Sequence, residues 1–195
     1  MGWRVLIFMC RRIFIGLTLA ATLLVSAVPE DYQAVVHKFY LIEHERVRPG
    51  SRVVLTLQEL NAYARQEIAD VAPDGVRNPH LDLGEGKATA FALIDFGKLR
   101  RAEGNPPGKL MAYLLDGERP VTITARIRSA EGTATVDVES VEISGVTLEG
   151  RMLEFLIQRY VIPAYPNAKV GQPFELGHRI ERLDVQPSAV AVVIR

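Results

Sequence analysis

The chain has very little cysteine and no excess of either charge. Its 195 residues include one cysteine, Cys10, which lies in an N-terminal segment typical of an export leader. Without that segment the chain has no thiol, so neither a disulfide nor a thiolate metal site is expected. Lys and Arg together number 23, and Asp and Glu also number 23. Because phosphate binding needs a basic excess, this balance argues against nucleic acid as a partner.

Motifs of nucleotide binding and nucleophilic catalysis are also missing. The sequence has no GxSxG nucleophile elbow and no glycine-rich dinucleotide fingerprint. The segment GEGKAT, residues 84–89, resembles part of a phosphate-binding loop. However, Leu81 and Ala88 stand where that loop needs a glycine and a hydroxyl residue, so we interpret it as a hairpin turn. His37 and His44 are seven residues apart and lack further ligands at metal-binding spacing. We therefore expect no enzymatic activity, no cofactor and no metal.

One enzymatic alternative stays open. Asp82 and Asp95 are expected on neighbouring strands of one hairpin, and two carboxylates can perform acid–base hydrolysis. Aspartates on the polar face of a strand are the commoner explanation of this pattern.

Residues 1–28 have the pattern of a secretory leader. Arg11 and Arg12 supply a positive n-region, and residues 13–25 form an apolar run without charge. Small residues suited to cleavage follow, ending at Ala27. An uncleaved membrane anchor is the alternative, although a full span needs about 20 residues. In both cases we expect a bacterial protein outside the cytoplasm, in the periplasm or cell envelope. Residues 29–195 are enough for a single domain and too few for two.

Two segments have the periodicity of amphipathic helices. In residues 51–71, Thr56 and Glu59 form a capping box, in which each side chain binds a backbone N–H at the helix start. Residues 148–162 form the second segment, and a shorter helix is expected within 30–45. The apolar positions of the two main helices recur at spacings of three and four. They are Leu57, Leu60, Ala64, Ile68 and Val71 in the first helix, and Met152, Leu153, Phe155, Leu156, Tyr160 and Val161 in the second.

Most of the remaining chain alternates apolar and polar residues, as half-buried strands do. Hairpins are expected over residues 80–96, 120–143 and 179–194. A shift in the phase of alternation near Glu139 and Ser140 predicts a β-bulge. These elements predict an α+β fold in which a strongly curved antiparallel sheet wraps two amphipathic helices.

One strand is apolar on both sides. Ala88, Ala90 and Ala92 face one way, whereas Phe91 and Leu93 face the other, which predicts a central strand. The small side chains would let a helix or a ligand chain approach the sheet closely. The apolar residues of the connection at 97–119 are expected to plug the core, to form a lip over a cavity, or to touch a membrane.

Two stretches resemble a known family. VVLTLQELNAYARQEI, and the long segment from VEISGVTLEGRMLEFLIQRY to the final strand, are similar to small exported bacterial proteins of the YpmS-like kind, near the TULIP (tubular lipid-binding) group. The resemblance extends over residues 53–194. It implies a curved sheet around two helices, a hydrophobic groove for acyl chains between helices and sheet, and no enzymatic chemistry.

The expected ligand is therefore a lipid or another hydrophobic small molecule, with a membrane surface or a second envelope protein as further partners. A scaffold module with a filled core is the alternative. The candidate groove residues are Leu57, Leu60, Ala64, Ile68, Phe91, Leu93, Met152, Phe155, Leu156 and Tyr160. Each of them would equally suit an ordinary dry core.

Overall fold

The computed structural model describes residues 29–71, 75–98, 117–158 and 170–195. The helices are α1 (Glu30–Glu43), α2 (Leu57–Val71) and α5 (Gly150–Leu156). The strands are β1 (Arg52–Thr56), β2 (Val76–Gly84), β3 (Lys87–Asp95), β4 (Glu118–Ala130), β5 (Thr133–Ile143), β6 (Val146–Glu149), β7 (Phe174–Glu175), β8 (Ile180–Gln186) and β9 (Ala189–Ile194). The α+β class with antiparallel pairing is confirmed.

The helix α2 begins at the predicted capping box. The backbone N–H of Thr56 donates to Oε2 of Glu59 at 2.8 Å, and the N–H of Glu59 donates to Oγ1 of Thr56 at 3.2 Å. Lys38 of α1 donates to both carboxylate oxygens of Glu59, at 2.6 and 2.8 Å. These contacts join α1 to the start of α2.

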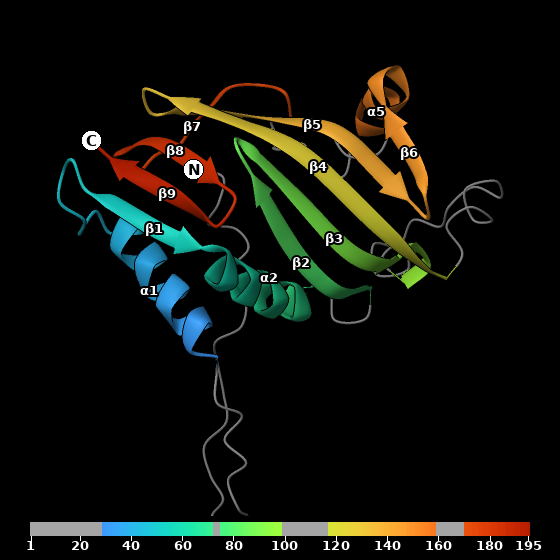
Figure 1. Ribbon diagram of the computed structural model, residues 1–195, viewed down its shortest axis with the longest axis horizontal. Coiled ribbons are helices and arrows are strands. Elements are labelled where there is room, and N and C mark those ends of the chain that lie inside the picture. Colours follow the sequence, from blue (N-terminus) through green and yellow to red (C-terminus); the bar gives the residue numbers. More distant parts are fainter. Residues whose placement is uncertain (1–28, 72–74, 99–116, 159–169) are drawn as a thin grey trace, which may run out of the picture.

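The strands form two sheets, not the single strongly curved sheet that the sequence favoured. One sheet has three strands in the order β1-β9-β8, and the other has six, in the order β2-β3-β4-β5-β6 with β7 also on β5 (Figure 1). No strongly curled sheet is found among the described residues. The strand β1 pairs with β9 near the C-terminus, with Val54 opposite Ala191, and not with β2, so that β1, β9 and β8 form a separate sheet.

The register of the six-stranded sheet confirms two predictions. Thr124 lies opposite Ser140, but the next residue, Ala125, lies opposite Val138. Glu139 is therefore the extra residue of a β-bulge, where the change of phase predicted one. The strand β3 lies between β2 and β4, so it is an inner strand of the sheet.

A filled core joins α1, α2 and the three-stranded sheet. Its most buried residues are Val35, Ile42, Leu55, Val192 and Ile194, each no more than 6% exposed. Leu60, Phe39 and Tyr63 pack against this cluster. The rings of Phe39 and Tyr63 meet edge to face, with centroids 4.9 Å apart. The predicted groove residue Leu60 thus belongs to ordinary core packing at this place.

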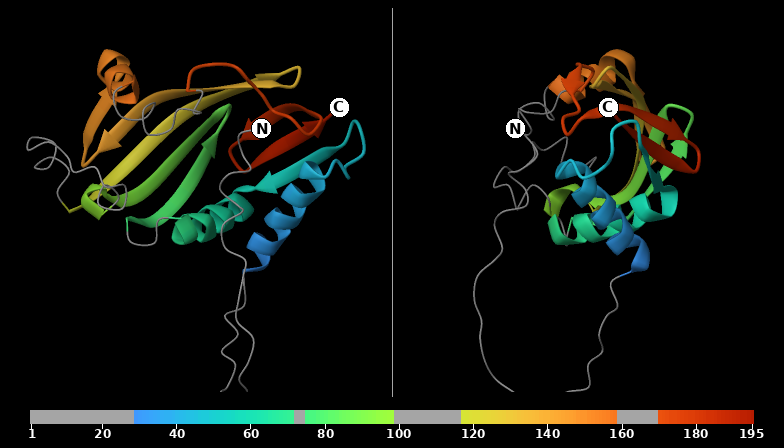
Figure 2. Two further views of the ribbon diagram at one scale, coloured as in Figure 1. Left: turned by 180° about the vertical axis from the view of Figure 1, so that it is seen from behind. Right: turned by 90° about the vertical axis from the view of Figure 1, so that its left-hand side faces the viewer.

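The second amphipathic helix differs from its prediction. Residues 146–149 extend the sheet as β6, so α5 begins only at Gly150. The part of the predicted helix after residue 158 lies outside the described residues, as does most of the connection at 97–119. Figures 1 and 2 show α5 beside β6, at the opposite end of the six-stranded sheet from α1 and α2. Over their described residues, α2 and α5 therefore contact opposite edges of one sheet.

Candidate functional site

One face of the six-stranded sheet is apolar from edge to edge. Residues directly opposite one another on neighbouring strands point to the same face, so the register defines rows of side chains. The first row consists of Leu81, Ala90, Ile123, Val141 and Leu148; the second of Ala92, Val121, Ile143 and Val146; the third of Leu83, Ala88, Ala125 and Val138. Every member is aliphatic, and the first row crosses five strands.

This apolar face is only partly covered. Val121 is 5% exposed, whereas Ile123 is 37% and Val146 is 62% exposed. The other members of the three rows are half-buried. The contrast with the core beside α1, where five side chains are almost fully buried, marks this face as a surface that accepts further apolar contact.

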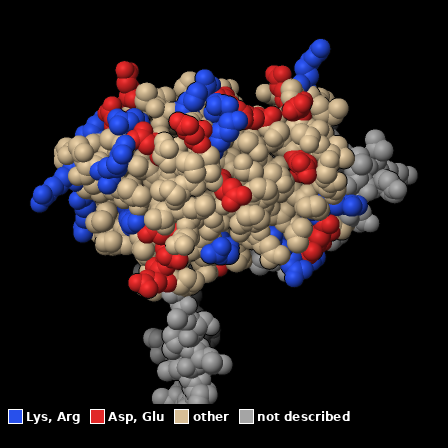
Figure 3. Space-filling model, viewed as in Figure 1, with Lys and Arg blue, Asp and Glu red and all other residues tan. Residues whose placement is uncertain are grey.

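The opposite face of the same sheet is polar. Lys87 and Arg126 each donate to the carboxylate of Glu139, both at 2.7 Å. Hydrogen bonds from Lys87 and Arg126 hold the pKa of Glu139 below its usual value. Arg128 donates to Asp137 at 2.6 Å. The charged side chains of this face are thus paired with one another. Figure 3 shows the side of the molecule seen in Figure 1, where acidic and basic side chains are interspersed around a centre with few of either.

The predicted groove residues do not come together in one place. Leu57, Ala64 and Ile68 are half-buried on α2, near the β2 edge of the sheet. Phe91 and Leu93 lie on the polar face, opposite the alanines of β3. There the ring of Phe91 stacks on His80, with centroids 4.5 Å apart.

The α5 candidates lie at the other edge. Met152 is 62% and Phe155 is 60% exposed, because α5 buries Leu153 instead. The side chain of Leu156, and all of Tyr160, lie outside the described structure. On the neighbouring elements β6 and α5, the exposed apolar side chains are therefore Val146, Met152 and Phe155.

Side chains close the outer edges of both sheets at specific points. The Oγ of Ser129 donates to the carbonyl of Leu183 at 3.0 Å and accepts from its N–H at 2.7 Å. Lys38 donates to the carbonyl of Val54 on β1 at 2.7 Å. Such contacts occupy backbone groups that an added strand would need.

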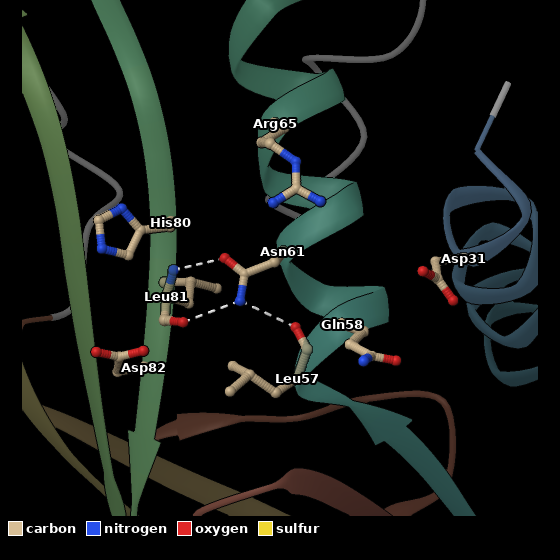
Figure 4. A pocket seen from close by; sticks show the side chains of 8 residues that line it. All are labelled: Asp31, Leu57, Gln58, Asn61, Arg65, His80, Leu81 and Asp82. Atoms are coloured by element: carbon tan, nitrogen blue, oxygen red, sulfur yellow. Dashed lines mark hydrogen bonds between the residues drawn. The ribbon is translucent and has the colours of Figure 1, made fainter.

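The β2 edge is closed by Asn61 of α2 (Figure 4). Its side-chain oxygen accepts from the N–H of Leu81 at 2.7 Å, and its side-chain nitrogen donates to the carbonyl of Leu81 at 2.9 Å. The same nitrogen donates to the carbonyl of Leu57 at 3.0 Å. All three polar contacts of the amide are therefore made within the protein.

Around Asn61 lies a polar cleft of about 480 Å³ between α2, β2 and the start of α1. Figure 4 shows the side chains that line it. They are Asp31, Leu57, Gln58, Asn61, Arg65, His80, Leu81 and Asp82. The volume lies within the range of small-molecule sites. The sequence patterns predicted that the polar residues among these face solvent. The one sequence signal of a contact on this side of α2 was Asn61, because asparagine disfavours a helix interior.

Between α1 and α2, burial changes two ionisable groups. Burial of Glu59 opposes ionisation, but the hydrogen bonds from Lys38 and from the N–H of Thr56 outweigh it, and the pKa of Glu59 falls below its usual value. Burial, together with the carboxylate of Glu67 that accepts its hydroxyl at 3.1 Å, raises the pKa of Tyr32 to about 12. Both groups stabilise the helix pair.

The two aspartates of the hydrolytic alternative lie far apart. Asp82 lies opposite Thr89 and Asp95 lies opposite Glu118, so the two aspartates are separated by about 20 Å along the strands. Among the described residues, no group of three or more His, Cys, Asp or Glu is arranged to hold a metal. In that same part of the chain, no helix is long and apolar enough to cross a membrane.

Searches against protein-family models, curated proteins and solved structures found no match for the chain. Function is therefore inferred from the surfaces described above and from the resemblance in sequence.

Proposed function

We propose that this is an exported, non-enzymatic protein of the bacterial cell envelope that binds a lipid or another hydrophobic molecule against the apolar face of its six-stranded sheet. The observation that carries the proposal is the set of aliphatic rows across five strands, in which Ile123 remains 37% exposed. Export by the N-terminal leader, in the periplasm or as an anchored protein, is part of the same proposal.

The chemistry of the face suits an acyl chain. Binding of a lipid tail yields about 0.8 kcal/mol for each methylene removed from water and needs few polar contacts. Ala88, Ala90 and Ala92 leave room for a chain to approach the backbone closely. The helices α2 and α5 contact the sheet at its β2 and β6 edges, so the apolar face extends between them. The resemblance to TULIP-like proteins implies the same ligand class and is part of the proposal.

A scaffold that binds another envelope protein is the second candidate. It is favoured by the exposed apolar side chains of Val146, Met152 and Phe155, which lie on the neighbouring elements β6 and α5. Addition of a strand from a partner is less suited to the other edges, where Asn61 and Ser129 already occupy backbone groups.

The decisive experiment measures lipid retained during purification. The full-length protein, produced in bacteria with its own leader and purified without detergent, is analysed by native mass spectrometry and by organic extraction. The apolar face is altered in Ile123→Asp, and the matched control is Thr122→Asp, which places the same charge on the opposite face of β4.

We expect wild type and Thr122→Asp to carry lipid and Ile123→Asp to lose it, with circular dichroism confirming that all three are folded. A wild-type protein that shows only the bare polypeptide mass contradicts the proposal. So does lipid retention that is unchanged by Ile123→Asp. A stoichiometric protein partner without lipid would establish the scaffold instead.

A further inference from the structure

A single charge lies on the apolar face of the six-stranded sheet. Arg119 is directly opposite Ile94 and alternates with Val121 and Ile123 along β4, so its side chain belongs to this face. Among the paired residues of the face that the structure describes, all the other members are uncharged. The strand β4 begins at Glu118, so Arg119 stands at the end of the sheet that lies away from β8 and β9 (Figure 1).

The guanidinium of Arg119 is not balanced by a carboxylate. The residue is half-buried, its Nε is buried without a hydrogen-bond partner, and the side chain takes part in no ion pair among the described residues. The acidic residues beside it in the register, Glu118 and Asp95, lie on the opposite face of the sheet. Both are already bonded there, because Glu118 accepts from Arg77 and Asp95 accepts from the N–H of Lys98, each at 2.9 Å.

An unpaired guanidinium among apolar side chains favours an anionic ligand. Val121, the next residue of β4 on the same face, is only 5% exposed, so water screens this end of the face poorly. A buried charge without a partner is costly, and a bound anion removes that cost. The planar fork of arginine matches the two oxygens of a carboxylate. Because this end of the face is enclosed, a compact carboxylate suits it better than a bulky head group.

The length of the face fits one acyl chain. From Arg119 to Ala125 the strand extends over about 20 Å, whereas the chains of one bilayer leaflet extend over about 15 Å. The side chains of β4 on this face between the two residues are aliphatic. We infer that the face binds a long-chain fatty acid, with its carboxylate at the guanidinium of Arg119 and its tail along the aliphatic rows toward Ala125. The inference rests on the proposed lipid binding and adds the class of the ligand and its direction.

The test compares two ligands that differ only in the head group. The full-length protein, freed of bound lipid, is titrated with radiolabelled palmitate and with radiolabelled hexadecanol in equilibrium binding experiments. In a second measurement, palmitate labelled at its carboxyl carbon is followed by NMR as the pH is changed. The variants are Arg119→Gln and Arg119→Lys. The matched control is Arg77→Gln, which removes an arginine at the same end of the sheet but on the opposite face.

We expect the wild type to bind palmitate more tightly than hexadecanol. Arg119→Gln should weaken palmitate binding about tenfold or more, the loss expected for one charge-assisted contact, and leave hexadecanol binding unchanged. Arg119→Lys should retain part of the preference for palmitate, and Arg77→Gln should retain all of it. The carboxyl group of bound palmitate should titrate at a lower pH in wild type than in Arg119→Gln, because the guanidinium stabilises the carboxylate.

Equal binding of palmitate and hexadecanol, or a preference that Arg119→Gln leaves unaltered, overturns the fatty-acid site while the proposed lipid binding stands. Loss of both ligands in a folded Arg119→Gln protein also overturns the site, because it assigns Arg119 a structural role. Binding of neither compound by the wild type overturns the site as well. Together with a bare polypeptide mass after native purification, that last result would reject the proposed function too.

Discussion

The side-chain amide of Asn61 makes the pair of hydrogen bonds with the backbone of Leu81 that a neighbouring β-strand would make. Its oxygen accepts from the N–H and its nitrogen donates to the carbonyl, at 2.7 and 2.9 Å. The helix α2 thereby occupies the place of a further strand beside β2. An edge strand with free backbone groups invites association with other chains, and this contact removes that opportunity at its centre.

Replacing Asn61 by alanine should destabilise the fold by about 2–3 kcal/mol. The substitution leaves the N–H and the carbonyl of Leu81 without partners, and unsatisfied backbone groups are costly. Alanine has a higher helix propensity than asparagine, and this gain offsets the loss of stability by about 0.5 kcal/mol. Urea unfolding measures the difference. Gln58→Ala, on the same helix, should stay within about 0.5 kcal/mol of wild type, and an equally small effect for Asn61→Ala would show that the contact contributes little.

Removal of the charge on Glu59 should destabilise the protein in a pH-dependent way. Because the pKa of Glu59 is lower in the fold than in the unfolded chain, the unfolded chain binds the proton more readily. The stabilisation is therefore present above the unfolded pKa of about 4.3 and is lost as pH falls through the folded value.

We expect Glu59→Gln to cost about 2 kcal/mol at pH 7, as for a hydrogen bond to a charged group. The difference from wild type should be smaller at pH 3 than at pH 7, because the stabilisation is lost as pH falls below the unfolded pKa toward the lower folded pKa of Glu59. Urea unfolding at the two pH values tests this, with the exposed Glu142→Gln as control. A difference that is the same at both pH values would assign the loss to packing and not to the ion pair with Lys38.

Local signals predicted the elements that depend on neighbours in sequence. The capping box of Thr56 and Glu59 gave the start of α2, and the change of phase gave the bulge at Glu139. The pairing of strands that are far apart in the sequence could not be predicted from such local signals. Val54 meets Ala191, and no local pattern of β1 indicates that its partner is β9 and not β2. The split into two sheets follows from that pairing.

The candidate site was predicted less well, for a physical reason. An apolar stripe predicts that one face of a helix is buried, but it does not predict the surface against which that face packs. Leu60 is buried against the three-stranded sheet, whereas Met152 and Phe155 face outward because α5 is anchored by Leu153. The alternation in β3 did place Ala88, Ala90 and Ala92 on one face. That the apolar face continues across β4, β5 and β6 could be recognised only from the register of the paired strands.

The hydroxyl of Tyr32 should ionise at an unusually high pH. Its pKa is raised to about 12 from 10.0, so the neutral form is favoured in the fold, and stability is lost as pH rises through this interval. Ultraviolet titration should show a phase near pH 12 that disappears in Tyr32→Phe. In Glu67→Gln, which removes the negative acceptor, the phase should move to lower pH. A titration that Tyr32→Phe leaves unaltered would refute this assignment.

The hydroxyl of Ser129 contributes to the joint between the two sheets, beside backbone hydrogen bonds from Gly86 and Gly132 to β8. It both donates to and accepts from the backbone of Leu183, so a single side chain connects β4 to β8. Ser129→Ala removes both bonds and leaves two backbone groups unpaired, which should cost about 1–3 kcal/mol. Ser188→Ala, in the exposed turn between β8 and β9, is the matched control and should change stability by less than about 0.5 kcal/mol. Hydrogen exchange adds a local measurement, because the N–H of Leu183 should lose protection in Ser129→Ala. The N–H of Val192, which lies opposite Leu183 on the inner strand β9 and is also paired with Val53 of β1, should keep it. Equal protection of Leu183 in both variants would mean that other contacts hold the sheets together, and that β8 stays in place without Ser129.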